Sequence, residues 1–277
     1  MDLIIEPGNK LRGEIYLPGD KSISHRVIMC ASLASGISTI KGLLESADCL
    51  RTIQAFRDMG IEISRQGELI IVEGKGLYGL KKPEKELDFG NSGTSMRLIS
   101  GILACQNFNS ILTGDISLLN RPMERITNPL KRMGLSIETQ NDGTPPLHIS
   151  KVNKISSIDY EMPVASAQVK SSILFAALYA NGTSTIREKS QTRDHTERIF
   201  DKFGIPIEIS GSNENKLITV KPPKEIQPCE VEVCSDFSSA AFFILAALIV
   251  PNSHLIIRNV GINKTRTGLL SALKEMG

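Results

Sequence analysis

Hydrophobic residues along the chain follow two spacings, one typical of helices and one typical of strands. Residues 27–33, 98–103 and 173–178 place apolar side chains at helical intervals with few polar residues between them, which predicts buried helices. Short segments rich in β-branched residues predict strands at 38–40, 110–112, 183–186 and 254–257. The alternation of the two patterns predicts a mixed α/β fold.

The same order of signals recurs about every 70 residues, so the chain is built from repeats. A methionine or phenylalanine followed by glycine closes an amphipathic segment in each repeat, at residues 59–60, 133–134, 203–204 and 276–277. Each unit reads β-α-β-α-β-β. Three units are complete, and the fourth stops at Gly277, where the others continue into closing strands. Because missing strands leave unpaired edge groups, we expect the chain to end inside a structural unit.

Composition narrows the class of protein. The 277 residues are 41% hydrophobic and 22% charged, which suits a globular protein of one large or two medium domains. A net charge of +2 argues against a nucleic-acid partner, since no broad basic surface is available to neutralise phosphates. The most apolar stretch, residues 240–250, is too short to span a bilayer and predicts a buried helix instead of a membrane segment.

Cysteine usage and the N-terminus point to one compartment. The five cysteines are scattered and lack the spacing of a zinc site, so we expect free thiols and no metal. The first residues carry acidic side chains and a proline where a secretory signal needs a basic start and an apolar run. We therefore expect a cytoplasmic protein.

Each unit opens with a small or polar turn before its first helix, at residues 18–22, 90–94, 165–168 and 235–239. In the first turn, Lys21, Ser22 and Arg26 place an ammonium, a hydroxyl and a guanidinium around a helix N-terminus, which favours anions. If the helix starts near Ser22, Arg26 lies one turn along the same face. The alternative is a serine N-cap followed by solvated basic residues.

The corresponding turns of the next two units also offer donors. Gly93 lacks a Cβ and allows close approach to the backbone N–H groups of its turn. Ser166 and Gln168 supply neutral donors and are followed by Lys170. Equivalent turns of repeated units fall at one end of an architecture, so these residues are expected to line a common cleft.

Four further residues carry candidate chemistry. Arg121 and Arg193 stand at junctions between loops and helices, where they either bind anions or only decorate a helix end with charge. His25 and His195 are acids or bases by type, but their charged neighbours favour orienting or structural roles. The phosphate-loop, dinucleotide and metal-helix motifs are missing from the sequence, so no cofactor is expected.

Six segments together carry a family resemblance: residues 18–26, 90–94, 121–123, 166–171, 193–197 and 263–268. They resemble the corresponding motifs of 5-enolpyruvylshikimate-3-phosphate synthases, and the resemblance runs the whole length of the chain. It implies the enolpyruvyl transferase fold, in which each of two domains is an inside-out α/β barrel, or α/β prism, of three repeats. One domain is expected to be complete in residues 19–227, and the other, made of residues 1–18 and 228–277, to be incomplete.

The resemblance also implies an activity. Family members transfer the enolpyruvyl group of phosphoenolpyruvate to the 5-hydroxyl of shikimate 3-phosphate and release phosphate, a step of aromatic amino acid and chorismate biosynthesis that glyphosate inhibits. It implies a monomer without cofactors whose partners are these two substrates. By position, the shikimate 3-phosphate contacts are Lys21, Ser22, Arg26, Ser166, Gln168 and Arg193. The phosphoenolpyruvate contacts are Lys21, Gly93, Arg121 and Gln168, with Lys21 also catalytic.

Two alternatives stay open. A sister enolpyruvyl transferase acts on UDP-N-acetylglucosamine and shares the fold, but it is expected to lack the segments seen here at residues 21–26 and 166–168. The second alternative is a module that only binds anions such as shikimate 3-phosphate, without catalysis, because its second domain, expected to be incomplete, cannot close the cleft. The acidic residues that the family uses for proton transfer are also expected beyond Gly277.

Overall fold

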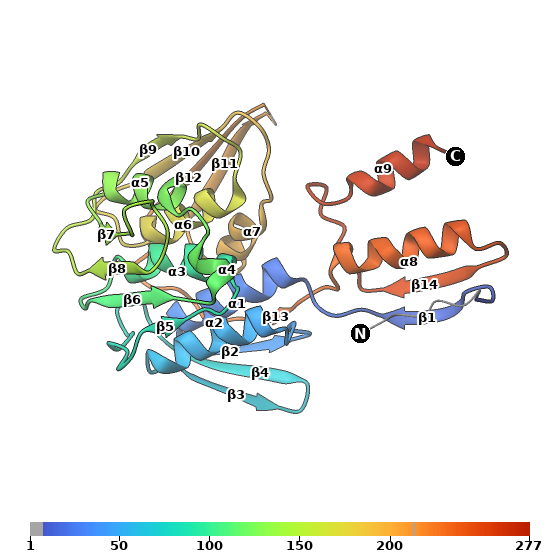
Figure 1. The fold of residues 1–277 in the computed structure, drawn as a ribbon, viewed down its shortest axis with the longest axis horizontal. Coiled ribbons are helices and arrows are strands. Elements are labelled where there is room, and N and C mark those ends of the chain that lie inside the picture. The colour runs from blue at the N-terminus through green and yellow to red at the C-terminus, as the bar shows by residue number, and fades with distance from the viewer. Residues whose placement is uncertain (1–7, 213) are drawn as a thin grey trace.

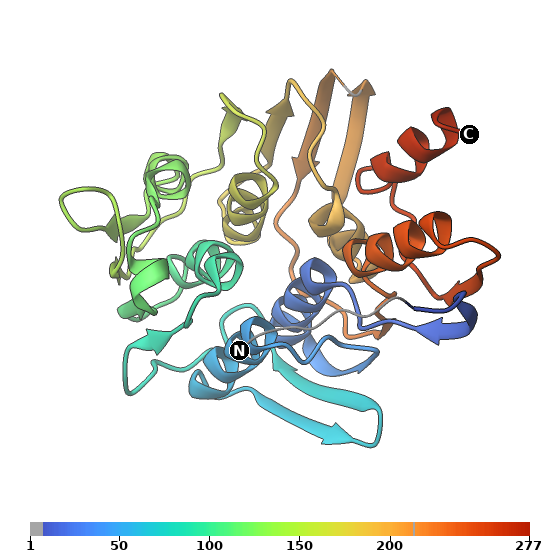
Figure 2. The ribbon, with the colours of Figure 1, turned by 45° about the vertical axis from the view of Figure 1, so that its right-hand side comes forward.

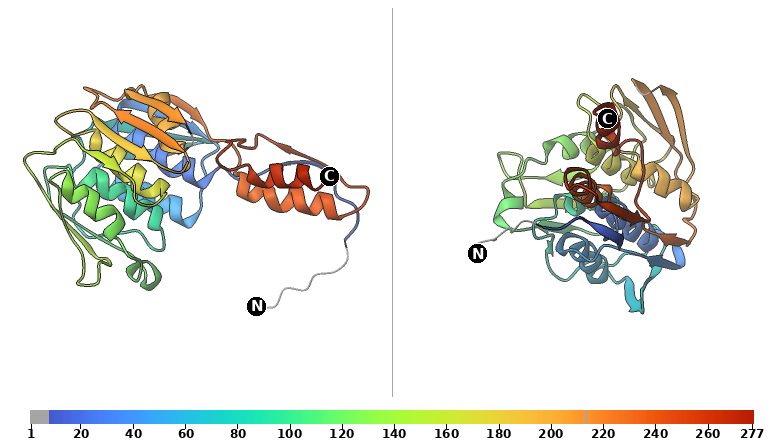
Figure 3. Two further views of the ribbon diagram at one scale, coloured as in Figure 1. Left: turned by 90° about the horizontal axis from the view of Figure 1, so that it is seen from above. Right: turned by 90° about the vertical axis from the view of Figure 1, so that its right-hand side faces the viewer.

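Helices and short strands alternate along the chain and form two parts, a large body and a small extension (Figure 1). The computed structural model describes residues 8–212 and 214–277. Two chain segments join the two parts, as the view from above shows (Figure 3). Mixed α/β content was predicted from the alternating hydrophobic patterns, and it is confirmed.

Each of the three four-stranded sheets of the body has a parallel pair of strands at one edge and antiparallel pairs elsewhere. The first sheet has the order β13-β2-β4-β3. Its segment of chain contains α1 (Lys21–Leu33), β2 (Ser35–Lys41), α2 (Ala47–Asp58), β3 (Glu62–Gln66) and β4 (Leu69–Lys75). The edge strand β13 (Glu230–Glu232) runs parallel to β2 and enters from the far end of the sequence.

The second and third sheets follow the same plan with all strands drawn from consecutive sequence. The second, in the order β5-β6-β8-β7, comes from β5 (Leu87–Asp88), α3 (Gly93–Leu103), β6 (Ser110–Thr113), α4 (Ile116–Leu119), α5 (Glu124–Arg132), β7 (Ser136–Glu138) and β8 (Leu147–Ser150). The third, in the order β11-β12-β10-β9, comes from β9 (Asp159–Glu161), α6 (Ala167–Ala177), β10 (Ser184–Glu188), α7 (His195–Lys202), β11 (Ile207–Ser212) and β12 (Asn215–Val220).

Three helices, α1, α3 and α6, lie side by side inside the body with the strands around them (Figure 2). Their apolar residues, from Val27 in α1 to Leu178 at the end of α6, are almost completely shielded from solvent. This confirms the buried helices predicted from the spacing. Close packing of α3 on α6 depends on Gly101, because a Cβ there would overlap the carbonyl oxygen of Ser172.

The extension combines sequence from both ends of the chain. Strand β1 (Arg12–Tyr16) pairs in parallel with β14 (His254–Arg258), beside α8 (Phe237–Ile249) and α9 (Gly268–Glu275) (Figure 1). Its order of elements therefore follows the start of the chain segments that form the three body sheets. The strand β13, which lies beyond residue 227, pairs with β2 of the first body sheet.

One expectation from the sequence is wrong. Residues 240–250 were predicted to form a buried helix, and α8 does form there, but only Phe237 and Ala240 of it are buried. Phe242 is 77% exposed and Ile249 is 76% exposed. The reason is that β14 packs on one side of α8, while no described element covers the opposite side. Among the described residues, no helix is both long and apolar enough to cross a membrane.

Candidate functional site

The first helix of the body starts one residue earlier than the sequence suggested. Helix α1 begins at Lys21, where a start near Ser22 was expected. Asp20 is its N-cap, and the Asp20 carboxylate accepts a hydrogen bond from the backbone N–H of Ile23 at 2.9 Å. Sequence reasoning overlooked Asp20 as the cap, although an aspartate directly before the helical pattern is a recognised signal for it.

Lys21 and Ser22 lie on the first turn of α1, where backbone N–H groups are still free. The Lys21 ammonium forms an ion pair with Asp48 and remains 45% exposed. Its backbone N–H donates to the Asp236 carboxylate at 3.3 Å, across the junction with the extension. A partly exposed cation at a helix N-terminus can exchange its carboxylate partner for an anionic ligand.

Arg26 is buried and ties three segments together. Its Nε donates to Thr196 Oγ1 at 2.7 Å, one terminal nitrogen donates to Ser22 O at 2.9 Å, and the other donates to Ser171 Oγ at 2.9 Å. Burial lowers the pKa of Arg26 to about 10, so the guanidinium keeps its charge at neutral pH. A guanidinium has five N–H donors, and these bonds use three of them.

Arg193 lies near Arg26 and Arg266, and the carboxylates of Asp20 and Asp236 offset part of its charge. Burial lowers its pKa, and the neighbouring Arg266 lowers it further. Arg266 is paired with Asp236 at 3.2 Å, whereas Arg193 forms no ion pair within residues 8–212 and 214–277. An exposed guanidinium that has no ion-pair partner among the described residues, at the junction of the two parts, is suited to bind an anion.

The turn before α3 brings Gly93 against two arginines. Ser92 caps the helix, and a Cβ added at Gly93 would lie 2.9 Å from a terminal nitrogen of Arg121 and 3.2 Å from one of Arg97. Arg121 also donates a hydrogen bond to the side-chain oxygen of Asn91. The missing methyl group of Gly93 therefore leaves room for two guanidinium groups beside a helix N-terminus.

Gln168, at the start of α6, contacts the arginines that lie around Gly93. Its Oε1 accepts from Arg97 at 2.8 Å and from Arg125 at 3.4 Å, while its Nε2 donates to Thr94 Oγ1 at 3.2 Å. Burial lowers the pKa of Arg97 to about 10, and the charges of Arg125 and Arg121 lower it further. In the described part of the chain these three arginines form no ion pair with a carboxylate, which leaves a concentrated positive charge.

Arg97 and Arg125 were not identified as site residues from the sequence. Arg97 follows Gly93 by four residues, just as Arg26 follows Ser22, so the same helical spacing was available as a signal. Arg125 lies in the first turn of α5, in a charged segment that carries no comparable pattern.

The third turn contributes fewer donors than its sequence suggested. Ser166 caps α6 and accepts from the backbone N–H of Val169 at 3.4 Å, so its hydroxyl hydrogen remains available to a ligand. Lys170 points inward instead. Its ammonium lies 2.6 Å from Glu197 and 3.0 Å from Glu188, and all three side chains are fully buried.

His25 and His195 remain neutral at physiological pH. Burial, assisted by the charges of Arg26 and Lys21, lowers the pKa of His25 to about 3. Burial and the charge of Arg26 lower the pKa of His195 to about 4. Uncharged, enclosed imidazoles fit the orienting or structural roles that the sequence favoured.

The predicted residues thus fall into two neighbouring groups. Lys21, Ser22, Arg26 and Arg193 surround the N-terminus of α1, and Gly93, Arg121 and Gln168 surround that of α3. Helix α6 connects the groups, because Gln168 and Ser166 lie at its start and Ser171 bonds Arg26. Within the described ranges, no cluster of three His, Cys, Asp or Glu side chains is arranged to hold a metal ion.

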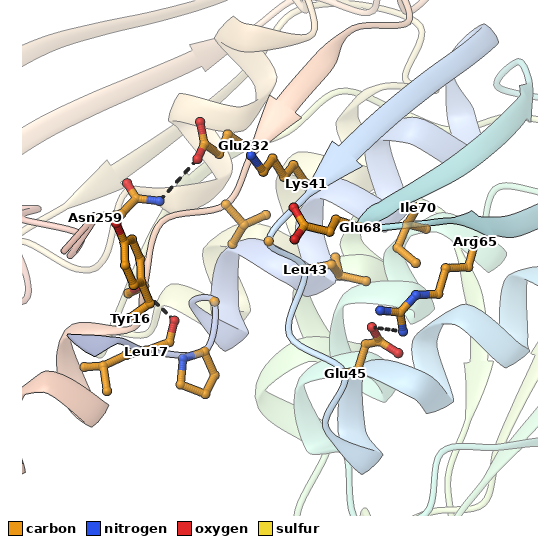
Figure 4. A pocket seen from close by; sticks show the side chains of 15 residues that line it. Tyr16, Leu17, Lys41, Leu43, Glu45, Arg65, Glu68, Ile70, Glu232 and Asn259 are labelled. Atoms are coloured by element: carbon orange, nitrogen blue, oxygen red, sulfur yellow. Dashed lines mark hydrogen bonds and ion pairs between the residues drawn. The ribbon is translucent and has the colours of Figure 1, made fainter. Parts of the chain in front are cut away.

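A cavity of about 540 Å³ lies where the chain crosses between body and extension, outside both groups. Tyr16, Leu17 and Asn259 line it from the extension, while Lys41 and Glu68 line it from the first sheet (Figure 4). Its walls carry charges of both signs, so it lacks the uniform positive charge of the arginine groups.

The chain belongs to the EPSP synthase (3-phosphoshikimate 1-carboxyvinyltransferase) family, whose model matches residues 5–277. It is 49% identical over 272 residues to the 3-phosphoshikimate 1-carboxyvinyltransferase of Methylococcus capsulatus, covering 98% of this chain and 61% of that protein. It is 50% identical over 274 residues to the enzyme of the same name from Pelobacter propionicus, covering 99% and 62%. The solved EPSP synthase from Acinetobacter baumannii matches with a TM-score of 0.91 and 46% identity, over 98% of this chain and 61% of that one. The chain therefore spans about three fifths of the length of these relatives.

Proposed function

We propose that this chain supplies the shikimate 3-phosphate site, and part of the phosphoenolpyruvate site, of an enzyme that transfers the enolpyruvyl group between them. The observation that carries the proposal is the set of three arginines around Gly93 and Gln168, which has no carboxylate partner among the described residues. Such a set requires anionic ligands to offset its mutual repulsion. Membership of the EPSP synthase family names those ligands.

In this proposal, each of the two groups of residues binds mainly one of the two substrates. Shikimate 3-phosphate lies against Lys21, Ser22, Arg26 and Arg193 at the start of α1, and against Ser166 and Gln168 at the start of α6. Phosphoenolpyruvate lies against Gly93, Arg121 and Gln168, with Lys21 reaching both ligands.

The chemistry needs this concentration of cations. The substrates together carry two phosphates and two carboxylates, whose repulsion opposes their approach unless fixed positive groups compensate it. The 5-hydroxyl oxygen then bonds to C2 of the enolpyruvyl group and loses its proton, while C3 gains one. The resulting tetrahedral intermediate eliminates phosphate as C3 returns a proton. Lys21 stabilises the negative charge near the reacting carbons in this scheme.

The architecture proposed for the body is an inside-out α/β barrel of three units. The support is that three similar four-stranded sheets surround the buried helices α1, α3 and α6. Residues 19–227, with β13 added, form this domain, and the extension is part of a fourth unit in a second domain. We further propose that the protein is a monomer, as the family resemblance implies.

A titration of two candidate substrates distinguishes this enzyme from its sister transferase. Isothermal calorimetry of the chain with shikimate 3-phosphate is expected to give binding that competes with inorganic phosphate, while UDP-N-acetylglucosamine gives none. Binding of the sugar nucleotide without binding of shikimate 3-phosphate would contradict the proposed function.

A further inference from the structure

A continuous chain of buried polar side chains links the start of α1 with the start of α3. His25 Nδ1 lies 2.7 Å from Thr52 Oγ1, and Thr52 Oγ1 lies 2.6 Å from Ser95 Oγ. Ser95 Oγ lies 2.6 Å from Ser92 Oγ, which also accepts from the Ser95 backbone N–H at 3.3 Å. At the other end, His25 Nε2 lies 3.8 Å from Cys49 Sγ. All five side chains are at most 1% exposed.

The hydrogen atoms of this chain can be assigned by counting donors and acceptors. If Ser92 donates to Ser95, Ser95 to Thr52, and Thr52 to His25 Nδ1, every hydroxyl has an acceptor. His25 then carries its proton on Nε2 and donates it toward Cys49 Sγ. In the reverse direction, the Ser92 hydroxyl hydrogen meets no acceptor among the described residues. The first direction is therefore the one that satisfies every buried donor.

We call this set of five hydrogen-bonded side chains the relay. Its two ends, Ser92 and Cys49, adjoin residues of the proposed phosphoenolpyruvate site. Ser92 is the N-cap of α3 and directly precedes Gly93. Cys49 Sγ lies 4.0 Å from the backbone carbonyl oxygen of Lys21, in the first turn of α1. Between them, Cys49 and Thr52 both lie on α2, so the two ring nitrogens of His25 hold that helix as well. Buried, fully satisfied networks of this kind fix the relative position of the elements that they join.

We propose that the relay Ser92, Ser95, Thr52, His25 and Cys49 positions the Gly93 turn against Lys21 and so sets the affinity for phosphoenolpyruvate. This inference rests on the proposed function. None of these five side chains needs to touch a substrate, so they are positioning residues. Shikimate 3-phosphate makes its proposed contacts with α1, α6 and Arg193, and none with α3, so its binding is expected to depend on the relay less than phosphoenolpyruvate binding does.

The proposal requires a neutral imidazole with an acceptor at Nδ1. Burial and the charges of Arg26 and Lys21 lower the pKa of His25 to about 3, which keeps the ring neutral. An asparagine can place its side-chain oxygen near the position of Nδ1, whereas alanine offers no acceptor. Thr52→Val removes the central hydroxyl with little change of shape.

The test compares two ligands on the 277-residue chain by NMR. Thr52→Val and His25→Ala are expected to weaken phosphoenolpyruvate binding by about tenfold, read from the Gly93 and Lys21 amides, and to weaken shikimate 3-phosphate binding much less. His25→Asn is expected to retain phosphoenolpyruvate affinity to within about twofold. Ser100→Ala is the matched control, because Ser100 is buried on α3 and bonds only Met96 O within its own helix.

Two measurements without ligand complete the test. Amide hydrogen exchange at Gly93, Thr94 and Ser95 is expected to accelerate in Thr52→Val relative to Ser100→Ala. The ¹⁵N shifts of His25 are expected to show the tautomer protonated at Nε2. Unchanged phosphoenolpyruvate affinity and exchange in Thr52→Val, equal weakening of both ligands, or protonation at Nδ1 would each overturn the proposal. Failure of the proposed function gives a different result, in which the unaltered chain binds neither ligand.

Discussion

Gly93 faces Arg121 so closely that a methyl group on Gly93 would lie 2.9 Å from a terminal nitrogen of the arginine. The contact couples the helix N-terminus of α3 to a guanidinium on a separate segment. Both are proposed to hold phosphoenolpyruvate, and the family resemblance implies that glyphosate occupies the same position. We therefore expect the space between the two residues to decide which anion fits.

The first prediction concerns the space between Gly93 and Arg121. Gly93→Ala should leave the melting temperature almost unchanged, because the two atoms that its methyl group would crowd lie at the far ends of long side chains, those of Arg121 and Arg97. It should weaken phosphoenolpyruvate binding and weaken glyphosate binding more, since the longer ligand loses more room. The dissociation constants from NMR titration check this.

Gly268→Ala is the matched control, because Gly268 also begins a helix and an added Cβ there meets nothing within 4 Å. An equal loss of affinity for the two ligands in Gly93→Ala would show that the methyl group acts on anion binding in general and that the steric explanation is wrong.

The second prediction concerns the buried ion pairs of Lys170. Replacing Lys170 by methionine leaves two fully buried carboxylates, Glu188 and Glu197, without their nearest cation. We expect the free energy of unfolding to fall by about 3–5 kcal/mol. Urea denaturation followed by circular dichroism measures the change.

A triple variant separates charge from packing at the same position. Adding Glu188→Gln and Glu197→Gln to Lys170→Met removes the unpaired charges and should recover a large part of the lost stability. If the triple variant were no more stable than Lys170→Met alone, loss of packing would explain the effect and the electrostatic account would fail.

The third prediction is a dependence of stability on pH that comes from the two buried histidines. In the unfolded chain a histidine takes up a proton below about pH 6.5, but the folded pKa values are about 3 for His25 and about 4 for His195. The unfolded state therefore binds more protons as the pH falls below 6.5, and stability is lost. Each histidine should contribute about 1.4 kcal/mol per pH unit in this window.

His25→Asn isolates one of these contributions. Between pH 7 and pH 5 the variant should lose about 2 kcal/mol less stability than the unaltered chain. Denaturant midpoints at several pH values provide the comparison. Identical slopes for the two proteins would mean that His25 is protonated in the folded state at pH 5.

The sequence predicted the buried helices well because their apolar spacing reports burial directly. It also predicted the donors at helix starts, such as Ser22 and Gly93, since repeated turns of the same type mark them. The exposure of α8 escaped prediction, because an apolar helix looks the same whether or not another element covers it. The burial of the Lys170 side chain could not be predicted either, because its carboxylate partners lie 18 and 27 residues away in sequence.

The role of Arg97 in the candidate site could not be predicted from a sequence motif. Its spacing from Gly93 was visible, but its role depends on Gln168, Arg121 and Arg125, which come from other segments. Only the folded arrangement shows that these charges converge, with no ion pair to a carboxylate across residues 8–212 and 214–277.

Arg193 provides the most direct test of the central claim, that the starts of α1 and α6 and the loop before α7 form one site for shikimate 3-phosphate. Calorimetric titration should show that Arg193→Ala weakens this ligand by about tenfold or more, as expected for loss of a charge-assisted contact. Arg187→Ala should bind like the unaltered chain, because Arg187 is exposed on β10 and paired with Asp159. Unchanged affinity in Arg193→Ala, or an equal loss in both variants, would contradict the account.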